Sequence, residues 1–124
     1  MGGQNPAAMI GLVEEWADEG ETSRDRPIAP LHLHRCEDEA WYVLEGALGF
    51  RVEDEEIEAV AGSAVIVPAG TPHSYWNATD GRARYVIVLG PKTAALIAAI
   101  HALAPSERAR LPALFEEHDS ELLV

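Results

Sequence analysis

The feature that most constrains the fold is a series of short β-branched and aromatic runs over residues 28–89, separated by turn signals. No helical pattern lies between these runs. Seven short strands at this spacing are typical of an antiparallel sandwich or barrel, so we predict an all-β fold. The Asp80-Gly81 pair is expected to close a hairpin, because glycine tolerates the positive φ of a tight turn. The expected strands are residues 31–35, 39–45, 48–53, 56–60, 64–68, 73–77 and 83–89.

The segments on either side of this region have different patterns. Apolar residues recur at helical spacing over 93–104, and Pro105 is expected to end that helix. Ser106 is a candidate N-cap for a second helix, which Pro112 should interrupt or restart. Residues 9–20 fit a helix or an edge strand, and we interpret them as a strand. The chain therefore divides into an N-terminal edge or dimer strand segment (1–27), a barrel (28–90) and a helical segment (91–124).

Length and charge limit the possible functions. The 124 residues suffice for one domain, and 48% hydrophobic content supports a core. With 9 basic and 21 acidic residues the net charge is −12, which disfavours nucleic acid and anionic membrane surfaces as partners. The single cysteine, Cys36, cannot form an internal disulfide, and the first residues do not resemble a signal peptide. We expect a cytoplasmic protein.

Three histidines and a glutamate form the candidate site. His32 and His34 are two residues apart in an expected strand, so their side chains point to the same face. Glu39 begins the next strand, and His73 lies on a later one after a turn with two prolines. A single strand histidine is usually structural, but imidazoles with a carboxylate are typical ligands of iron, manganese, nickel, cobalt, copper or zinc. The set therefore predicts one divalent transition metal.

The spacing of these residues resembles the two motifs of the cupins. The first motif has His-x-His, four residues, Glu, six residues and Gly. The second has Gly, five residues, Pro-x-Gly, two residues, His, three residues and Asn. The matching residues are His32, His34, Glu39 and Gly46, followed by Gly62, Pro68, Gly70, His73 and Asn77. Arg26 stands where the first motif often opens with a glycine, so the departure concerns that loop.

The resemblance implies an antiparallel double-stranded β-helix, the cupin jelly-roll barrel, with one or two C-terminal helices. It implies that His32, His34, Glu39 and His73 are metal ligands. Within the family, the sequence from His32 to Val52 is most similar to quercetin dioxygenase-like members. That similarity implies a dioxygenase for a flavonol- or diketone-like substrate, with Glu39 also the general base. The alternatives are a metal-dependent isomerase or lyase, or a non-enzymatic protein that binds a small molecule or a metal.

Strand alternation indicates which other residues surround the site. Trp41 and Val43 should point inward with Glu39, and Tyr75 inward with His73, which suits a small hydrophobic or aromatic ligand. Asn77 is interpreted as a structural hydrogen-bonding residue. Elsewhere, Cys36 is read as a free thiol, His101 as packed on the helix and His118 as solvated.

The predicted assembly is a homodimer. The apolar residues of the first segment have no obvious partner in the barrel, so we expect two chains to pair through a β-sheet face that includes the N-terminal strand.

Overall fold

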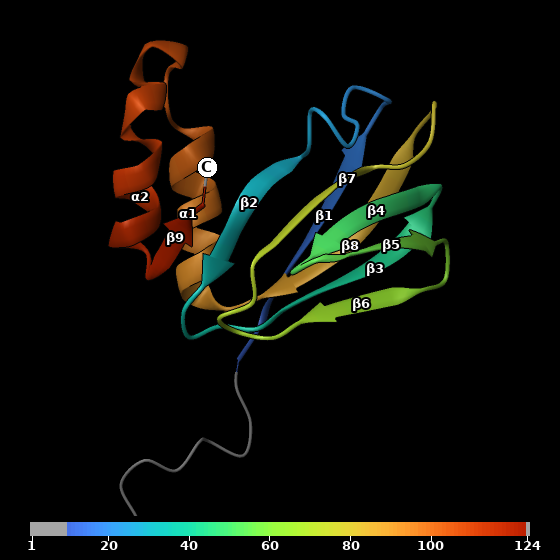
Figure 1. Ribbon diagram of the computed structural model, residues 1–124, viewed down its shortest axis with the longest axis horizontal. Coiled ribbons are helices and arrows are strands. Elements are labelled where there is room, and N and C mark those ends of the chain that lie inside the picture. Colours follow the sequence, from blue (N-terminus) through green and yellow to red (C-terminus); the bar gives the residue numbers. More distant parts are fainter. Residues whose placement is uncertain (1–9, 124) are drawn as a thin grey trace, which may run out of the picture.

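The structure, a computed structural model, describes residues 10–123 as two facing antiparallel sheets with helices beside one of them (Figure 1). The first sheet has the strand order β1-β8-β3-β6, and the second has the order β5-β4-β7-β2-β9. The strands are β1 (Leu12–Asp18), β2 (Ala29–His34), β3 (Glu39–Glu45), β4 (Ala47–Val52), β5 (Glu55–Val60), β6 (Ala64–Val67), β7 (His73–Asn77), β8 (Ala83–Leu89) and β9 (Ser120–Leu122). The helices are α1 (Pro91–His101), the 3₁₀ helix η1 (Pro105–Arg110) and α2 (Leu111–Glu117).

The predicted all-β jelly-roll class and its C-terminal helices are confirmed. Each of the seven predicted strands is present within two residues of its expected ends. The segment interpreted as a strand forms β1, which lies at the edge of the first sheet and pairs along its whole length with β8. The sequence did not predict β9, which pairs with β2 at the edge of the second sheet. Residue 9 was also predicted to belong to this strand, but it lies outside the described residues.

Two turn and cap predictions are wrong. Asp80-Gly81 does not close a hairpin, because β7 and β8 belong to different sheets and the connection crosses between them. Ser106 is not an N-cap: the 3₁₀ helix begins one residue earlier at Pro105, after Ala104. Pro112 does restart a helix: it lies in the first turn of α2, where a backbone N–H has no partner within the helix and the missing N–H of proline costs nothing.

The core lies between the two sheets and consists of inward-facing residues of both. The buried cluster contains Trp41, Val43, Leu48, Phe50, Ala59, Val67, Tyr75, Ala83, Tyr85, Ile87 and Leu89. A second apolar cluster of Leu96, Leu114 and Phe115 joins α1 to α2. The turn between β3 and β4 requires glycine at position 46, where φ is 75° and a Cβ would lie 2.6 Å from the carbonyl oxygen of Arg82. No helix among the described residues is long and apolar enough to cross a membrane.

Helix α1 is attached to the barrel by a buried carboxylate. Glu37 lies in the loop between β2 and β3, and it accepts hydrogen bonds from the backbone N–H groups of Lys92 (3.0 Å) and Thr93 (2.8 Å). The hydroxyl of Thr93 donates a third bond to it at 2.8 Å. A carboxylate at a helix N-terminus satisfies orphan N–H groups and interacts favourably with the helix dipole. The loop that leads from His34 to Glu39 thus also fixes the position of α1.

Candidate metal centre and its cavity

The four candidate ligands converge inside the barrel. His32 and His34 project inward from β2, Glu39 begins β3, and His73 begins β7 directly opposite His32 in the β2–β7 register. One ligand atom from each residue lies within 4.8 Å of every other. All four residues are buried, with at most 5% of their surface exposed. The structure thus brings together the residues that the sequence spacing singled out.

The tautomers of all three imidazoles are set by hydrogen bonds on their outer nitrogens. The Nδ1–H groups of His32 and His73 donate to the carbonyl oxygens of Pro30 and Thr71, the latter at 2.8 Å. The Nδ1–H of His34 donates to the hydroxyl oxygen of Ser120 at 2.7 Å, because that hydroxyl uses its own hydrogen on the His118 carbonyl. Each Nε2 therefore carries a lone pair directed at the centre, as in metal-bound histidines.

These lone pairs face a carboxylate. Oε1 of Glu39 lies 3.1 Å from Nε2 of both His34 and His73. The buried Nε2 of His34 has no hydrogen-bond partner of good geometry among residues 10–123. Acceptor atoms this close repel one another unless a proton or a cation lies between them. The donor set and its unpartnered nitrogen therefore fit a divalent cation.

The protonation of the cluster is consistent with a cation site. Burial, together with a smaller effect of the neighbouring His73 and His34, lowers the pKa of His32 to about 3, so His32 is neutral at neutral pH. Burial alone would raise the pKa of Glu39, but contacts with His34 and His73 outweigh it and hold the pKa at about 2. The cluster thus offers a neutral imidazole at His32 and an ionised carboxylate at Glu39, the forms that bind metals.

A cavity of about 370 Å³ adjoins the cluster. His32, His34 and Glu39 form one part of its wall. The apolar wall comes from the barrel and from α1 and α2, through Ile28, Ile87, Leu96, Ile97, Ile100 and Phe115. The volume of the cavity lies in the lower part of the range found for small-molecule pockets.

Of the predicted pocket residues, Tyr75 lines this cavity. Trp41 and Val43 point inward as expected and are at most 1% exposed, but they belong to the packed core. Tyr85, which the sequence did not single out, also lines the cavity, and its hydroxyl lies 3.0 Å from that of Tyr75. Burial raises the pKa of Tyr85 to about 12 and that of Tyr75 above its ordinary value.

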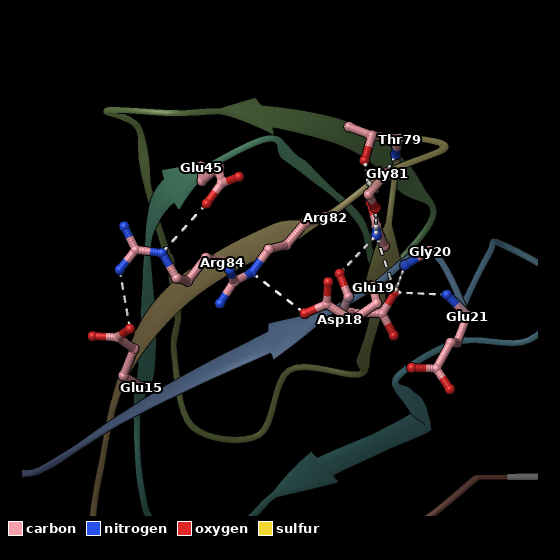
Figure 2. Close-up of polar contacts among 11 residues, drawn as sticks. Glu15, Asp18, Glu19, Gly20, Glu21, Glu45, Thr79, Gly81, Arg82 and Arg84 are labelled. Atoms are coloured by element: carbon pink, nitrogen blue, oxygen red, sulfur yellow. Dashed lines mark hydrogen bonds and ion pairs between the residues drawn. The ribbon is translucent and has the colours of Figure 1, made fainter.

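Asn77 has the structural role expected of it. Its side-chain amide donates to Asp18 Oδ2 at 3.0 Å and to the Gly81 carbonyl at 2.7 Å, and its side-chain oxygen accepts from Thr79. Figure 2 shows Asp18 beside the turn that holds Thr79 and Gly81. Asp18 also accepts bonds from backbone N–H groups that follow β1, including that of Gly20 at 3.1 Å. Asn77 thus ties the end of β1 to the β7–β8 connection.

Of the two remaining histidines, one has the surroundings that were predicted and one does not. His101 is packed as predicted: although its surface is largely exposed, its ring meets Trp16 edge-on at 5.0 Å between centroids, and it lines the cavity beside the apolar residues of α1. His118 is half-buried rather than solvated, because its Nδ1–H donates to the Leu114 carbonyl at 2.8 Å. Cys36 is a free, exposed thiol.

The arginines near the motifs lie outside the site. Arg84 forms an ion pair with Glu15 at 3.0 Å and approaches Glu45 at 3.5 Å, and Arg82 pairs with Glu19 (Figure 2). Among the cavity-lining residues of the described chain, Arg108 of η1 is the only arginine or lysine.

This fold and site define a family, and the comparisons identify it. The model of the cupin domain matches residues 24–89, so the chain belongs to the cupin family. A 46-residue stretch is 41% identical to quercetin 2,3-dioxygenase of Bacillus subtilis (strain 168). That match covers 37% of this chain and 14% of the Bacillus protein, so this chain corresponds to a small part of it.

Solved structures show the same fold. A protein of Thermus thermophilus is 30% identical, with a TM-score of 0.55 over 65% of this chain and 72% of that chain. A sugar phosphate isomerase from the cupin superfamily, from Silicibacter pomeroyi, is 29% identical, with a TM-score of 0.54. That match covers 64% of this chain and 50% of the isomerase.

Proposed function

We propose that this cupin holds one divalent transition metal through His32, His34, Glu39 and His73, and that it is a dioxygenase for a small, largely apolar substrate of flavonol or diketone type. The observation that carries the proposal is the buried three-histidine, one-carboxylate cluster that opens onto an apolar cavity. The partial match to a quercetin dioxygenase supports the same reaction class.

The protein's residues have distinct tasks in this proposal. The bound metal supplies Lewis acidity toward substrate oxygens and a place where dioxygen can react. His32, His34 and His73 hold it in place, and their outer hydrogen bonds fix their orientation. Glu39 is ionised and accepts the proton of the substrate's enol hydroxyl on a carboxylate oxygen. The apolar wall excludes water from the activated substrate.

A metal-dependent isomerase is the second candidate, because one of the similar structures is a sugar phosphate isomerase. The lining of the cavity favours the dioxygenase. A sugar phosphate requires several polar groups and cations, whereas Arg108 is the only arginine or lysine on the described cavity wall, which is mainly apolar. A site of this character suits a flat apolar substrate better than a phosphorylated sugar.

The test is dioxygen uptake by protein loaded separately with iron, manganese, nickel, cobalt, copper and zinc. Each form is given a flavonol, an enolisable diketone and a sugar phosphate. The proposal predicts substrate-dependent dioxygen consumption with the flavonol or the diketone, and its loss in His34→Ala. Isomerisation of the sugar phosphate without dioxygen uptake would support the second candidate. Metal binding with neither reaction would indicate a binding protein.

A further inference from the structure

The cavity wall contains a pair of buried phenols that the proposed reaction does not use. Tyr75 on β7 and Tyr85 on β8 come from opposite sheets, and their hydroxyl oxygens are 3.0 Å apart. Both residues line the cavity, and they are 8% and 3% exposed. Their rings meet edge to face at 5.6 Å between centroids. The two phenols therefore brace each other and face the same cavity as the metal cluster.

The hydrogens of this pair do not all find acceptors. Two hydroxyl groups have two hydrogens, and the bond between Tyr75 and Tyr85 uses one of them. The second hydrogen has no acceptor among residues 10–123. Trp41 packs edge-on against Tyr75 at 5.2 Å between ring centroids and helps to fix its position. A hydroxyl hydrogen at the cavity wall can donate to an acceptor in the cavity, and a hydrogen bond of this kind contributes about 0.5–1.5 kcal/mol.

We propose that the Tyr75–Tyr85 pair is a ligand subsite that donates one hydrogen bond to an oxygen of the bound molecule. This inference rests on the proposed function, because it places the metal-binding end of the ligand at the histidine cluster. Tyr75 is two residues from His73 on the same face of β7, which corresponds to about 7 Å along the strand. The two oxygens of a simple diketone are too close together to reach both places.

The ligand class follows from this separation. The Cα atoms of His73 and Tyr75 are about 7 Å apart. The molecule therefore has metal-binding oxygens at one end, an acceptor such as a carbonyl or phenolate oxygen well separated from them, and an apolar ring between. An aromatic ring spans that distance, and the apolar wall around Ile87 and Leu96 accommodates it. Within the proposed substrates, the subsite selects polyoxygenated aromatic compounds over short aliphatic diketones.

The experiment uses the full chain loaded with zinc, which has no redox chemistry, and two matched probes. 4-Nitrocatechol and 4-isopropylcatechol both chelate through two oxygens, but only the nitro group accepts a hydrogen bond. The variants are Tyr75→Phe and Tyr85→Phe, and the control is Tyr42→Phe, which lies 45% exposed outside the barrel. Calorimetry gives each Kd, and comparison within one probe removes intrinsic differences between the catechols. Thermal unfolding verifies that each variant is folded.

The subsite predicts that Kd for 4-nitrocatechol rises about 3- to 10-fold in Tyr75→Phe or Tyr85→Phe and stays unchanged in Tyr42→Phe. Kd for 4-isopropylcatechol should stay the same in all three. Equal losses for both probes, or no loss for either, would overturn the subsite. The non-chelating pair nitrobenzene and cumene repeats the comparison without metal binding. If 4-nitrocatechol binds no better than nitrobenzene, chelation by the bound metal adds nothing, and the proposed metal centre is wrong. The subsite is then tested by comparing nitrobenzene with cumene in the same variants.

Discussion

Nδ1 of His34 lies 2.7 Å from the hydroxyl oxygen of Ser120, which is 86 positions later in the chain. Ser120 is fully buried and begins β9, whose pairing with β2 sets it opposite His34. The short C-terminal strand thus orients the candidate ligand His34 through the ring nitrogen that faces away from the metal centre. Groups that orient ligands in this way are worth about 10- to 100-fold in metal affinity.

Ser120→Ala should therefore weaken metal binding by about 10- to 100-fold without unfolding the barrel. The alanine leaves the His34 Nδ1–H without its acceptor, so the ring loses its fixed orientation. A competition titration with a chromophoric chelator measures the affinity. Ser106→Ala, at an exposed position of η1, is the control and should bind as the parent does. Unchanged affinity in Ser120→Ala would show that β9 does not support the site.

The ligand set could be predicted from the sequence because it depends on local spacing. His32 and His34 share a face of one strand, and the turns before Glu39 and His73 are encoded by adjacent residues. The contributions of Ser120 and Tyr85 could not be predicted in this way. Ser120 lies in an acidic tail whose three-residue strand has no alternating pattern of its own, and it pairs only because β2 offers an edge.

The misread turn has a similar origin. Asp80-Gly81 has the composition of a hairpin turn, but the strands on either side of it pair in different sheets. Asn77 holds this crossing by its bonds to Asp18 and Gly81. Local turn chemistry therefore indicated a change of direction correctly, whereas the partner of each strand was decided by long-range packing.

Glu39→Gln should separate proton transfer from metal binding. The amide oxygen can still coordinate weakly but cannot accept a proton, so kcat should fall about 10²- to 10⁴-fold, while metal affinity falls less than in any histidine variant. Steady-state dioxygen uptake and metal content, measured on the same preparation, give the two values. Glu45→Gln, at an exposed carboxylate of the same strand, should retain full activity. Full activity in Glu39→Gln would remove the base role.

We predict a homodimer because the outer face of the first sheet carries a row of apolar residues. The strand register aligns Val13, Val88, Ala40 and Ile66 in one row across four strands, and Ile66 is 71% exposed. Burying such a row against a second copy removes apolar surface from water. We expect a dimer by light scattering at micromolar concentration, and an increase of at least about tenfold in its dissociation constant for Ile66→Lys.

The control for the dimer is Val60→Lys, since Val60 is 54% exposed but lies on β5 in the other sheet. It should leave the assembly unchanged. A parent protein that scatters as a monomer, or equal dissociation in both lysine variants, would contradict pairing through the first sheet.

Asp18 should make stability depend on pH in the acid range. Burial alone would raise its pKa, but hydrogen bonds from Asn77 and from the N–H groups of Gly20, Thr22 and Glu21 outweigh burial and lower the pKa below 3.8. Because the folded pKa is depressed, this stabilisation is present above the unfolded pKa and is lost as pH falls through the folded one.

Asp18→Asn should therefore lower the free energy of unfolding by about 1–3 kcal/mol at pH 7, and the difference from the parent should shrink below about pH 4. Urea unfolding from pH 7 to pH 2.5 measures it. Asp54→Asn, at the exposed turn between β4 and β5, serves as the control. A difference that stays constant with pH would show that the charge of Asp18 does not contribute.

Metal content per chain tests the proposed centre most directly. After loading and removal of weakly bound ions, elemental analysis should find about one divalent transition metal in the parent and in His101→Ala and His118→Ala. His32→Ala, His34→Ala and His73→Ala should each contain much less than one, because a buried ligand is lost and its neighbours are left facing a carboxylate. Full metal loading of folded His34→Ala would contradict the assignment of the metal centre.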